Sequence, residues 1–346
     1  MNKYDSLNLK DFEKLSDRKK TPSLKFKKRK VTRSLTKTEG FISDIALKGL
    51  VCGISGTRIL VETESSGCFE CTTAGVVITK NENQSIVAVG DVVYILPDKN
   101  QSGKTATIIK VEERRNHFSR KEVGYEKEDV IAANIDILIV MLSVKSPKYN
   151  KRLLDRFLVT AELNNVEPII CINKIDLSDD INLKSDFDIY KKLKYQTFFI
   201  SAKELIGMNE LKEIINDKTC VLSGPSGSGK STFINSMMGK SKQFVQETSN
   251  KTNKGRHTTS SVKMFKLSNG SRIIDTPGVR EFGIWGLEKS ELALYFHEFD
   301  DFNPKCKYYP CTHTHEPECA VIDALEKGMI DYGRYESYLN LFDSLS

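Results

Sequence analysis

A glycine-rich stretch, GPSGSGKST at residues 224–232, has the residue types and spacing of a loop that cradles phosphates. It matches G-x-x-x-x-G-K-[ST], follows the apolar run TCVLS and opens the helical stretch STFINSMM. Glycines let backbone N–H groups converge on phosphate oxygens, and the helix N-terminus adds its positive dipole end. Lys230 is predicted to reach the β- and γ-phosphates, and the Ser231 hydroxyl to bind Mg²⁺. The predicted loop contacts are Gly224, Pro225, Ser226, Gly227, Ser228, Gly229, Lys230, Ser231 and Thr232. The alternative interpretation is a glycine-rich loop with an unrelated lysine.

A second short motif, DTPG at 275–278, follows the apolar run RII and has the form D-x-x-G. Asp275 is predicted to hold Mg²⁺, through water, and the backbone N–H of Gly278 is predicted to bond the γ-phosphate. Four residues are weak evidence alone. Beside a phosphate loop they indicate the second half of a nucleoside triphosphate site.

The position after DTPG lacks the glutamine with which many GTPases orient the attacking water, because Val279 stands there. An apolar side chain cannot orient water, so slow intrinsic hydrolysis is predicted. The stretch GRHTTS at 255–260 falls where the first switch is expected, and Thr258 or Thr259 is predicted to bind Mg²⁺. His257 is a candidate to position water if a partner orders the loop, and the alternative is a surface histidine.

Two further motifs predict which base is bound. NKID at 173–176 follows a buried strand, and a carboxylate at Asp176 can accept two hydrogen bonds from guanine, a pair that adenine does not offer. Asn173 is predicted to support the loop, and Lys174 to lie over the ring. SAK at 201–203 ends the next strand, where the Ala202 N–H can meet the guanine carbonyl. Together they favour GTP over ATP, with predicted contacts at Asn173, Lys174, Ile175, Asp176, Ser201, Ala202 and Lys203.

A cysteine- and histidine-rich segment, CKYYPCTHTHEPEC at 306–319, predicts a metal site. Three thiolates and one imidazole suit tetrahedral Zn²⁺, and four protein ligands leave no open position for catalysis, so the site is predicted to be structural. The candidate ligands are Cys306, Cys311, Cys319 and one of the two histidines, His313 or His315. The alternative is a set of thiols without metal. CFEC at 68–71 has no second pair nearby and is interpreted as two strand cysteines.

The elements that must position these motifs are predicted to form three domains, preceded by a basic tail. The tail covers residues 1–40, and the domains cover 41–115, 116–282 and 283–346. From about residue 134 to 282, apolar strands alternate with helical stretches such as 150–165, which predicts a parallel α/β sheet with ligand loops at the carboxyl ends of its strands. Short β-rich runs between about 48 and 113 predict a five-stranded barrel of the OB type. The barrel either binds oligonucleotide or is purely structural. The last part reads as helices around the cysteine cluster.

Charge is uneven along the chain, although the net charge is only +6. Residues 18–37 hold ten Lys/Arg and no Asp or Glu, which indicates a disordered tail, a basic arm for nucleic-acid phosphates, or both. No apolar run is long enough to span a membrane, and the N-terminus lacks the apolar core of a signal peptide. A cytoplasmic location is therefore expected.

Along the chain the motifs come in the order NKID, SAK, phosphate loop, GRHTTS and DTPG. The base-recognition motifs therefore precede the phosphate loop, which is a circular permutation of the usual GTPase order. At this point the chain resembles the circularly permuted, ribosome small-subunit-dependent GTPases, the RsgA/YjeQ family. The resemblance covers about residues 45–345. It is carried by VGDVV (89–93), ERRNHFSR (113–120), IAANIDILIV (131–140), LLDRFLV (153–159), NKID, GPSGSGKSTFIN, GRHTT, DTPGVREFG and CTHTHEPECAV.

The resemblance implies an OB-fold barrel, a permuted GTPase domain and a C-terminal zinc domain, with the family's spacing favouring His313 over His315. It also implies a cytoplasmic, ribosome-associated GTPase, monomeric when free, that binds the small (30S) ribosomal subunit and its rRNA late in maturation. GTP or GDP, Mg²⁺ and one Zn²⁺ are the implied ligands, and the subunit is expected to stimulate hydrolysis. The alternatives are an RNA-binding factor for which GTP is only a conformational ligand, and a permuted GTPase with a non-ribosomal target.

Overall fold

The computed structural model describes residues 46–78, 85–98, 104–121, 128–239, 261–276 and 284–345. Five N-terminal strands form the predicted barrel, and β1 closes it by pairing with both β2 and β4. Its interior is filled by inward-facing apolar side chains such as Val51, Val61, Val93 and Ile108, all fully buried. The barrel strands are β1 (Leu47–Ser55), β2 (Arg58–Thr63), β3 (Gly67–Ile78), β4 (Val92–Pro97) and β5 (Thr105–Val111).

A separate two-stranded hairpin follows the barrel, and a larger sheet follows the hairpin. The hairpin, which the sequence reasoning missed, comprises β6 (His117–Lys121) and β7 (Glu128–Ala133). The larger sheet has the order β10-β9-β8-β11-β13-β12, parallel except for β12. Its strands are β8 (Ile137–Ser143), β9 (Glu167–Asn173), β10 (Gln196–Phe199), β11 (Thr219–Ser223), β12 (Val262–Lys266) and β13 (Arg272–Asp275).

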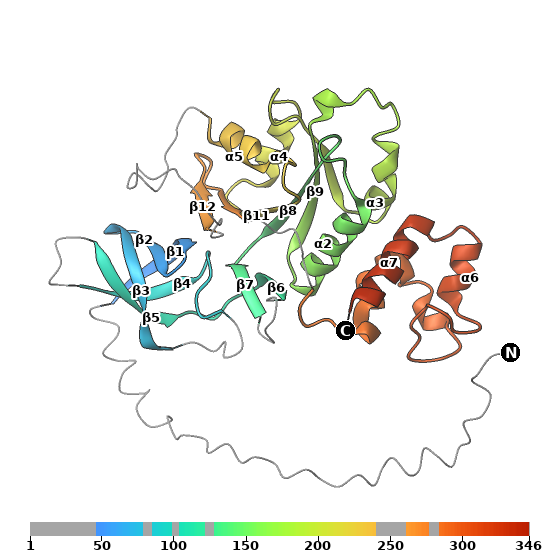
Figure 1. Ribbon diagram of the computed structural model, residues 1–346, viewed down its shortest axis with the longest axis horizontal. Helices are drawn as coiled ribbons and strands as arrows, with labels where there is room; N and C mark the ends of the chain where they lie inside the picture. The colour runs from blue at the N-terminus through green and yellow to red at the C-terminus, as the bar shows by residue number, and fades with distance from the viewer. Residues whose placement is uncertain are drawn as a thin grey trace, which may run out of the picture. The chain divides into compact units, whose positions relative to one another are not determined.

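Helices cover both faces of this sheet, which explains why β8 is apolar along its length. Alternate β8 residues Leu138 and Val140 pack into one core with α2, while Ile139 and Met141 pack into a second core with α5. Figure 1 shows α2 and α3 on one side and α4 and α5 on the other. These helices are α2 (Lys151–Leu163), α3 (Asp188–Lys192), α4 (Met208–Ile214) and α5 (Lys230–Met238).

The C-terminal part consists of short 3₁₀ turns and two helices around an aromatic core that contains Phe296, Phe299 and Tyr338. Its elements are η5 (Lys289–Tyr295), η6 (His297–Phe299), η7 (Asn303–Lys305), α6 (Ala320–Glu326) and α7 (Tyr332–Ser344). None of the helices described is both long and apolar enough to cross a bilayer.

A buried ion pair fastens this part to the sheet's helix α2. Arg334 of α7 donates to Asp155 of α2 at 2.5 Å and to both carboxylate oxygens of Glu298 at 2.6 and 3.0 Å. The Asp155 and Arg334 side chains are only 1% and 2% exposed, and Tyr190 also donates to Asp155. Breaking such a pair by removing one partner typically costs about 3–5 kcal/mol, so the contact specifies how α7 packs on α2.

Candidate nucleotide and metal sites

The predicted nucleotide residues come together at the carboxyl ends of four strands of the sheet. The base motif ends β9, SAK follows β10, the phosphate loop follows β11 and Asp275 ends β13. Because β9, β10, β11 and β13 run parallel, these ends share one edge, as the alternating pattern predicted.

The phosphate loop crosses the end of β8 so closely that it needs glycine. Gly224 has φ 142°, and a Cβ there would lie 2.1 Å from the Met141 carbonyl oxygen. Gly229 has φ 96°, and a Cβ there would lie 2.2 Å from the Asn173 amide nitrogen. A side chain at either position would push the loop away from its neighbours, so the glycines set the path of the loop.

Asn173 joins three of the motifs. Its amide nitrogen donates to the Ser228 carbonyl at 2.9 Å, and its amide oxygen accepts from the N–H groups of Lys174 and Ala202 at 2.8 and 3.0 Å. The side chain is therefore a structural link between base loop, SAK and phosphate loop. The predicted bond from the Ala202 N–H to guanine stays a prediction.

Asp176 lies exposed on the short turn η3 (Ile175–Leu177), where its carboxylate accepts from the Ser201 hydroxyl at 2.5 Å. The Ser201 hydroxyl in turn accepts from the Glu204 N–H at 3.1 Å, which fixes its orientation. The Ile175 N–H bonds the Ile200 carbonyl at 3.2 Å, and Lys203 is exposed beside Glu204. These contacts hold one carboxylate oxygen of Asp176 in place.

A stretch after β8 that the sequence reasoning did not single out completes the base side. The Lys174 ammonium group donates to the carbonyl oxygens of Ser146 and Lys145 at 2.6 and 3.2 Å. Gly227 approaches the same stretch, since a Cβ there would lie 3.2 Å from Pro147. The only signal for this stretch in the sequence was its position after a buried strand of the sheet, where ligand-binding loops are expected. Stacking of Lys174 on the base stays a prediction.

Lys230, at the end of the phosphate loop, and Asp275 form a desolvated pair of opposite charges. Burial lowers the Lys230 pKa, and burial raises the Asp275 pKa, while the charge of each partner opposes the shift. The Lys230 ammonium group donates to the Gly224 and Pro225 carbonyls at 2.7 and 2.9 Å. Asp275 Oδ1 is buried with no hydrogen-bond partner in the described ranges.

An unpartnered buried carboxylate oxygen fits a role in holding a divalent cation, directly or through water. Ser231 is exposed at the start of α5, so its hydroxyl is accessible as a second ligand. The donor set therefore fits Mg²⁺, which prefers oxygen ligands. Ser226 and Thr232 are exposed, whereas Ser228 is buried.

Four predicted residues, together with the basic stretch 18–37, lie outside the described residues, so their roles stay predictions. The residues are Gly278, His257, Thr258 and Thr259.

The predicted metal ligands meet in the C-terminal part. The ligand atoms of all four lie within 4.8 Å of one another. His313 Nδ1 lies 3.3 Å from Cys319 Sγ and 3.6 Å from Cys306 Sγ, and the two sulfurs lie 3.9 Å apart. Tetrahedral zinc with bonds of about 2.3 Å requires sulfur–sulfur separations of about 3.8 Å. The cluster of Cys306, Cys311, His313 and Cys319 therefore fits zinc, and His315 is exposed outside it.

Hydrogen bonds within the loop and from α7 stabilise the loop at 311–316, which carries the ligands Cys311 and His313. Burial alone raises the Glu316 pKa, but hydrogen bonds, mainly from Thr312, lower it to about 2. Tyr335 and Tyr338 of α7 donate to the carbonyl oxygens of His313 and Thr312 at 2.7 and 2.6 Å. The hydrogen bonds to Glu316 and from α7 therefore fix the shape of this loop.

Replacing Asp176 by Asn is expected to weaken GTP binding about 10- to 100-fold, because two charge-assisted hydrogen bonds to guanine are lost. Xanthosine triphosphate should bind the variant better than the wild type, since its C2 carbonyl accepts from the new amide. Titration of both proteins with GTP and with xanthosine triphosphate gives the affinities and shows whether the preferred nucleotide changes. Asp179→Asn, an exposed acid three residues away, is the control. Equal GTP affinities for wild type and D176N contradict the assignment.

Comparisons with known proteins agree with this architecture. The RsgA GTPase family model matches residues 111–285. The small ribosomal subunit biogenesis GTPase RsgA of Chlorobaculum parvum is 43% identical over 305 residues, which cover 86% of this chain and 98% of the relative. The protein of the same name from Chlorobaculum tepidum is 42% identical, covering 87% and 98%.

Two solved structures are similar over the same extent. The crystal structure of YjeQ from Thermotoga maritima has a TM-score of 0.65 and 32% identity, covering 87% of this chain and 99% of that one. YloQ, described as a circularly permuted GTPase, has a TM-score of 0.62 and 26% identity, covering 87% and 96%. The chain therefore belongs to the RsgA GTPase family and is a P-loop enzyme that hydrolyses GTP.

Proposed function

We propose that this GTPase acts in late maturation of the small ribosomal subunit, binding the 30S particle and hydrolysing GTP to GDP and phosphate faster when bound. The observation that carries the proposal is the extent of the match to relatives named for small ribosomal subunit biogenesis. It covers 86% of this chain, whereas the GTPase family model accounts only for residues 111–285. The similarity therefore extends well beyond the nucleotide-binding part.

For the nucleotide, the geometry of the site supports the following proposed roles. Asp176 accepts from the guanine edge, Asn173 holds the surrounding loops, and Lys230 binds the β- and γ-phosphates. Ser231 and Asp275 would hold Mg²⁺, which neutralises charge that develops on the phosphates during transfer. The desolvated Lys230 supports this role, because a buried ammonium group gains most from an anionic partner.

Hydrolysis needs a group to orient water, and Val279 cannot supply it. We therefore infer that the bound subunit completes the site, either by ordering GRHTTS so that His257 positions water or by contributing its own group. Thr258 or Thr259 is then the switch residue that binds Mg²⁺. Gly278 would bond the γ-phosphate.

The remaining parts are proposed to serve docking. One Zn²⁺ at the cysteine–histidine cluster is structural, because four protein ligands leave no open coordination position. Contacts with rRNA are proposed for the barrel and for the basic tail at 18–37, since barrels of this type often bind oligonucleotides and lysines neutralise phosphates. The protein is proposed to be monomeric when free, cytoplasmic and ribosome-associated.

Phosphate release from GTP is expected to accelerate when purified small subunits are added, and to stay at the intrinsic rate with large subunits. Single-turnover rates measured against subunit concentration give both the stimulation and the half-saturating concentration. A rate that small subunits leave unchanged contradicts the proposal. GTP-dependent binding to the subunit without stimulation indicates instead a binding factor for which GTP is a conformational ligand.

A further inference from the structure

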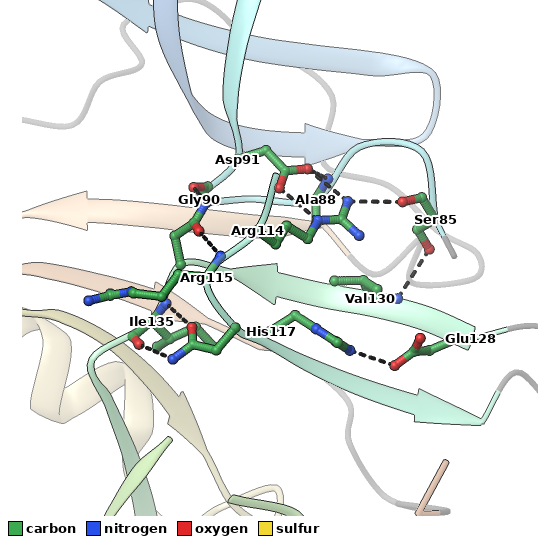
Figure 2. A network of polar contacts seen from close by, with 12 residues as sticks. Ser85, Ala88, Gly90, Asp91, Arg114, Arg115, His117, Glu128, Val130 and Ile135 are labelled. Atoms are coloured by element: carbon green, nitrogen blue, oxygen red, sulfur yellow. Dashed lines mark hydrogen bonds and ion pairs between the residues drawn. The ribbon is translucent and has the colours of Figure 1, made fainter. Parts of the chain in front are cut away.

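A network of buried polar groups joins the barrel to the segment that leads into the GTPase sheet (Figure 2). Arg114, after β5, donates to both carboxylate oxygens of Asp91 at 2.8 and 2.9 Å, and to the Ser85 carbonyl at 2.9 Å. The Asp91 and Arg114 side chains are 0% and 3% exposed, and Asp91 also accepts from the Ala88 N–H at 2.7 Å. A bidentate pair fixes orientation as well as distance, so this network is a rigid connection.

Asn134 lies three residues before β8 and bonds both the turn before β4 and the segment after β5. Its amide nitrogen donates to the Gly90 carbonyl in the turn before β4, and its amide oxygen accepts from the Arg115 N–H, both at 2.9 Å. Asn134 has φ 55°, a conformation that asparagine and glycine tolerate best. The backbones also touch here, since a Cβ on Gly90 would lie 2.1 Å from the Ala133 carbonyl oxygen. We call Asp91, Arg114, Asn116, Asn134 and Asp136 the polar joint.

The polar joint continues to the strand that carries the phosphate loop. The Asn116 amide exchanges two 2.8 Å hydrogen bonds with the backbone of Ile135. Asp136 accepts from the Thr219 N–H through its carboxylate, and its own N–H donates to the Thr219 carbonyl, both at 2.8 Å. Thr219 is the first residue of β11, an inner strand of the sheet between β8 and β13. The polar joint therefore links the barrel to the middle of the sheet.

A second attachment lies at the edge of the sheet, where barrel strand β1 pairs with β12. Gly53 is in register with Lys263, and Lys263 is in register with Asp275 on β13. Adjacent strands lie about 4.8 Å apart, so the barrel backbone at Gly53 is about 10 Å from the backbone of the predicted Mg²⁺ ligand. Barrel and nucleotide-binding sheet are thus one continuous sheet.

Between the two attachments lies an open cleft of about 650 Å³. Lys48 and Glu62 line it from the barrel, Lys266 and Arg272 from β12 and β13, and Asn134 from the joint. Met264 of β12 belongs to the same apolar core as Val51 of β1, and Lys266 pairs with Glu62 across the cleft. The polar joint adds to this packing, because the Gly90 N–H donates to the Val51 carbonyl of β1 at 2.8 Å.

We propose that the polar joint holds β1 on β12, so that barrel and β12–β13 hairpin move together, and that Asn134 is a positioning residue for stimulated hydrolysis. A partner bound to the barrel then acts on Asp275 through two strand pairings. The proposal rests on the proposed function, because it assumes that the small subunit stimulates the enzyme.

Asn134→Gly tests it, because glycine keeps the positive φ and removes only the amide. Intrinsic hydrolysis, GTP affinity and the half-saturating subunit concentration should stay at wild-type values. The maximal stimulated rate should fall about 5-fold or more. Amide hydrogen exchange at 262–266 should accelerate, whereas exchange in α7 should not change. Lys194→Gly is the control, since Lys194 also has positive φ, is exposed and lies outside the polar joint.

Full stimulation of N134G overturns the proposal, as does lost stimulation with unchanged exchange at 262–266. A raised half-saturating concentration at an unchanged maximal rate also overturns it, because Asn134 would then belong to the docking surface. If small subunits fail to stimulate even the wild type, the proposed function fails, while the exchange experiment still tests the joint.

A covalent rescue provides a second measurement. Gly53→Cys and Lys263→Cys occupy partner positions, and a Cβ on Gly53 meets nothing closer than Leu60 at 3.5 Å. Oxidising this pair in the N134G background should restore stimulation, and reduction should abolish it again. N134G alone under the same oxidant controls for damage to the other cysteines. A cross-link that forms without restoring stimulation overturns the proposal.

Discussion

Treating the purified protein with a zinc chelator is expected to unfold residues 284–345 while GTP binding persists. The four ligands come from one 14-residue segment, and the core around them is small. Structural zinc sites contribute apparent binding free energies of about 10–16 kcal/mol, more than this core can replace. Thermal unfolding should therefore split into two transitions, with the first appearing at much lower temperature after chelation. One zinc per chain should be released.

Cys319→Ser should reproduce the effect of chelation, because it removes a buried ligand. Cys68→Ser is the matched control, since Cys68 lies on β3 and is not part of the cluster. An unfolding profile that is the same with and without chelator contradicts a structural metal.

Lys230→Met is expected to lower the hydrolysis rate at saturating GTP about 10²- to 10³-fold, as for loss of one transition-state donor. Methionine keeps most of the length of the side chain and removes the charge that interacts with Asp275 and is predicted to bind the phosphates. Single-turnover phosphate release, with and without small subunits, measures the loss in both states.

Lys218→Met is the control, because Lys218 is an exposed lysine just before the same strand, β11, at its opposite end. Hydrolysis by K230M at the wild-type rate contradicts the phosphate-loop assignment. A loss seen only with subunits present would place Lys230 in the response to the partner.

Local signals predicted most of the fold. Alternating apolar residues bounded by glycine and asparagine placed the five barrel strands, and the apolar runs placed β8, β9, β10, β11 and β13. The strand β12, VKMFK, was missed because five residues with two lysines carry little pattern. Its pairing with β1 joins residues more than 200 positions apart, and no local pattern encodes such a contact.

For the sites too, features encoded in short segments were predicted and long-range contacts were missed. The motif residues were predicted because their chemistry is confined to short segments, and the structure confirms that Cys306, Cys311, His313 and Cys319 meet. The buried pair of Asp155 and Arg334 was missed, since its partners lie 179 residues apart. A carboxylate within the apolar stretch LLDRFLV was a usable signal, because a buried charge requires a partner.

The pair of Asp155 and Arg334 has a consequence for avidity. It fixes α7 to α2, so the C-terminal part is presented without the freedom of a linker. Once another surface of the chain is bound to a large partner, the C-terminal part meets its own contact at a high effective concentration. Two individually weak contacts can then give tight binding. Loosening one attachment should speed dissociation without removing any contact.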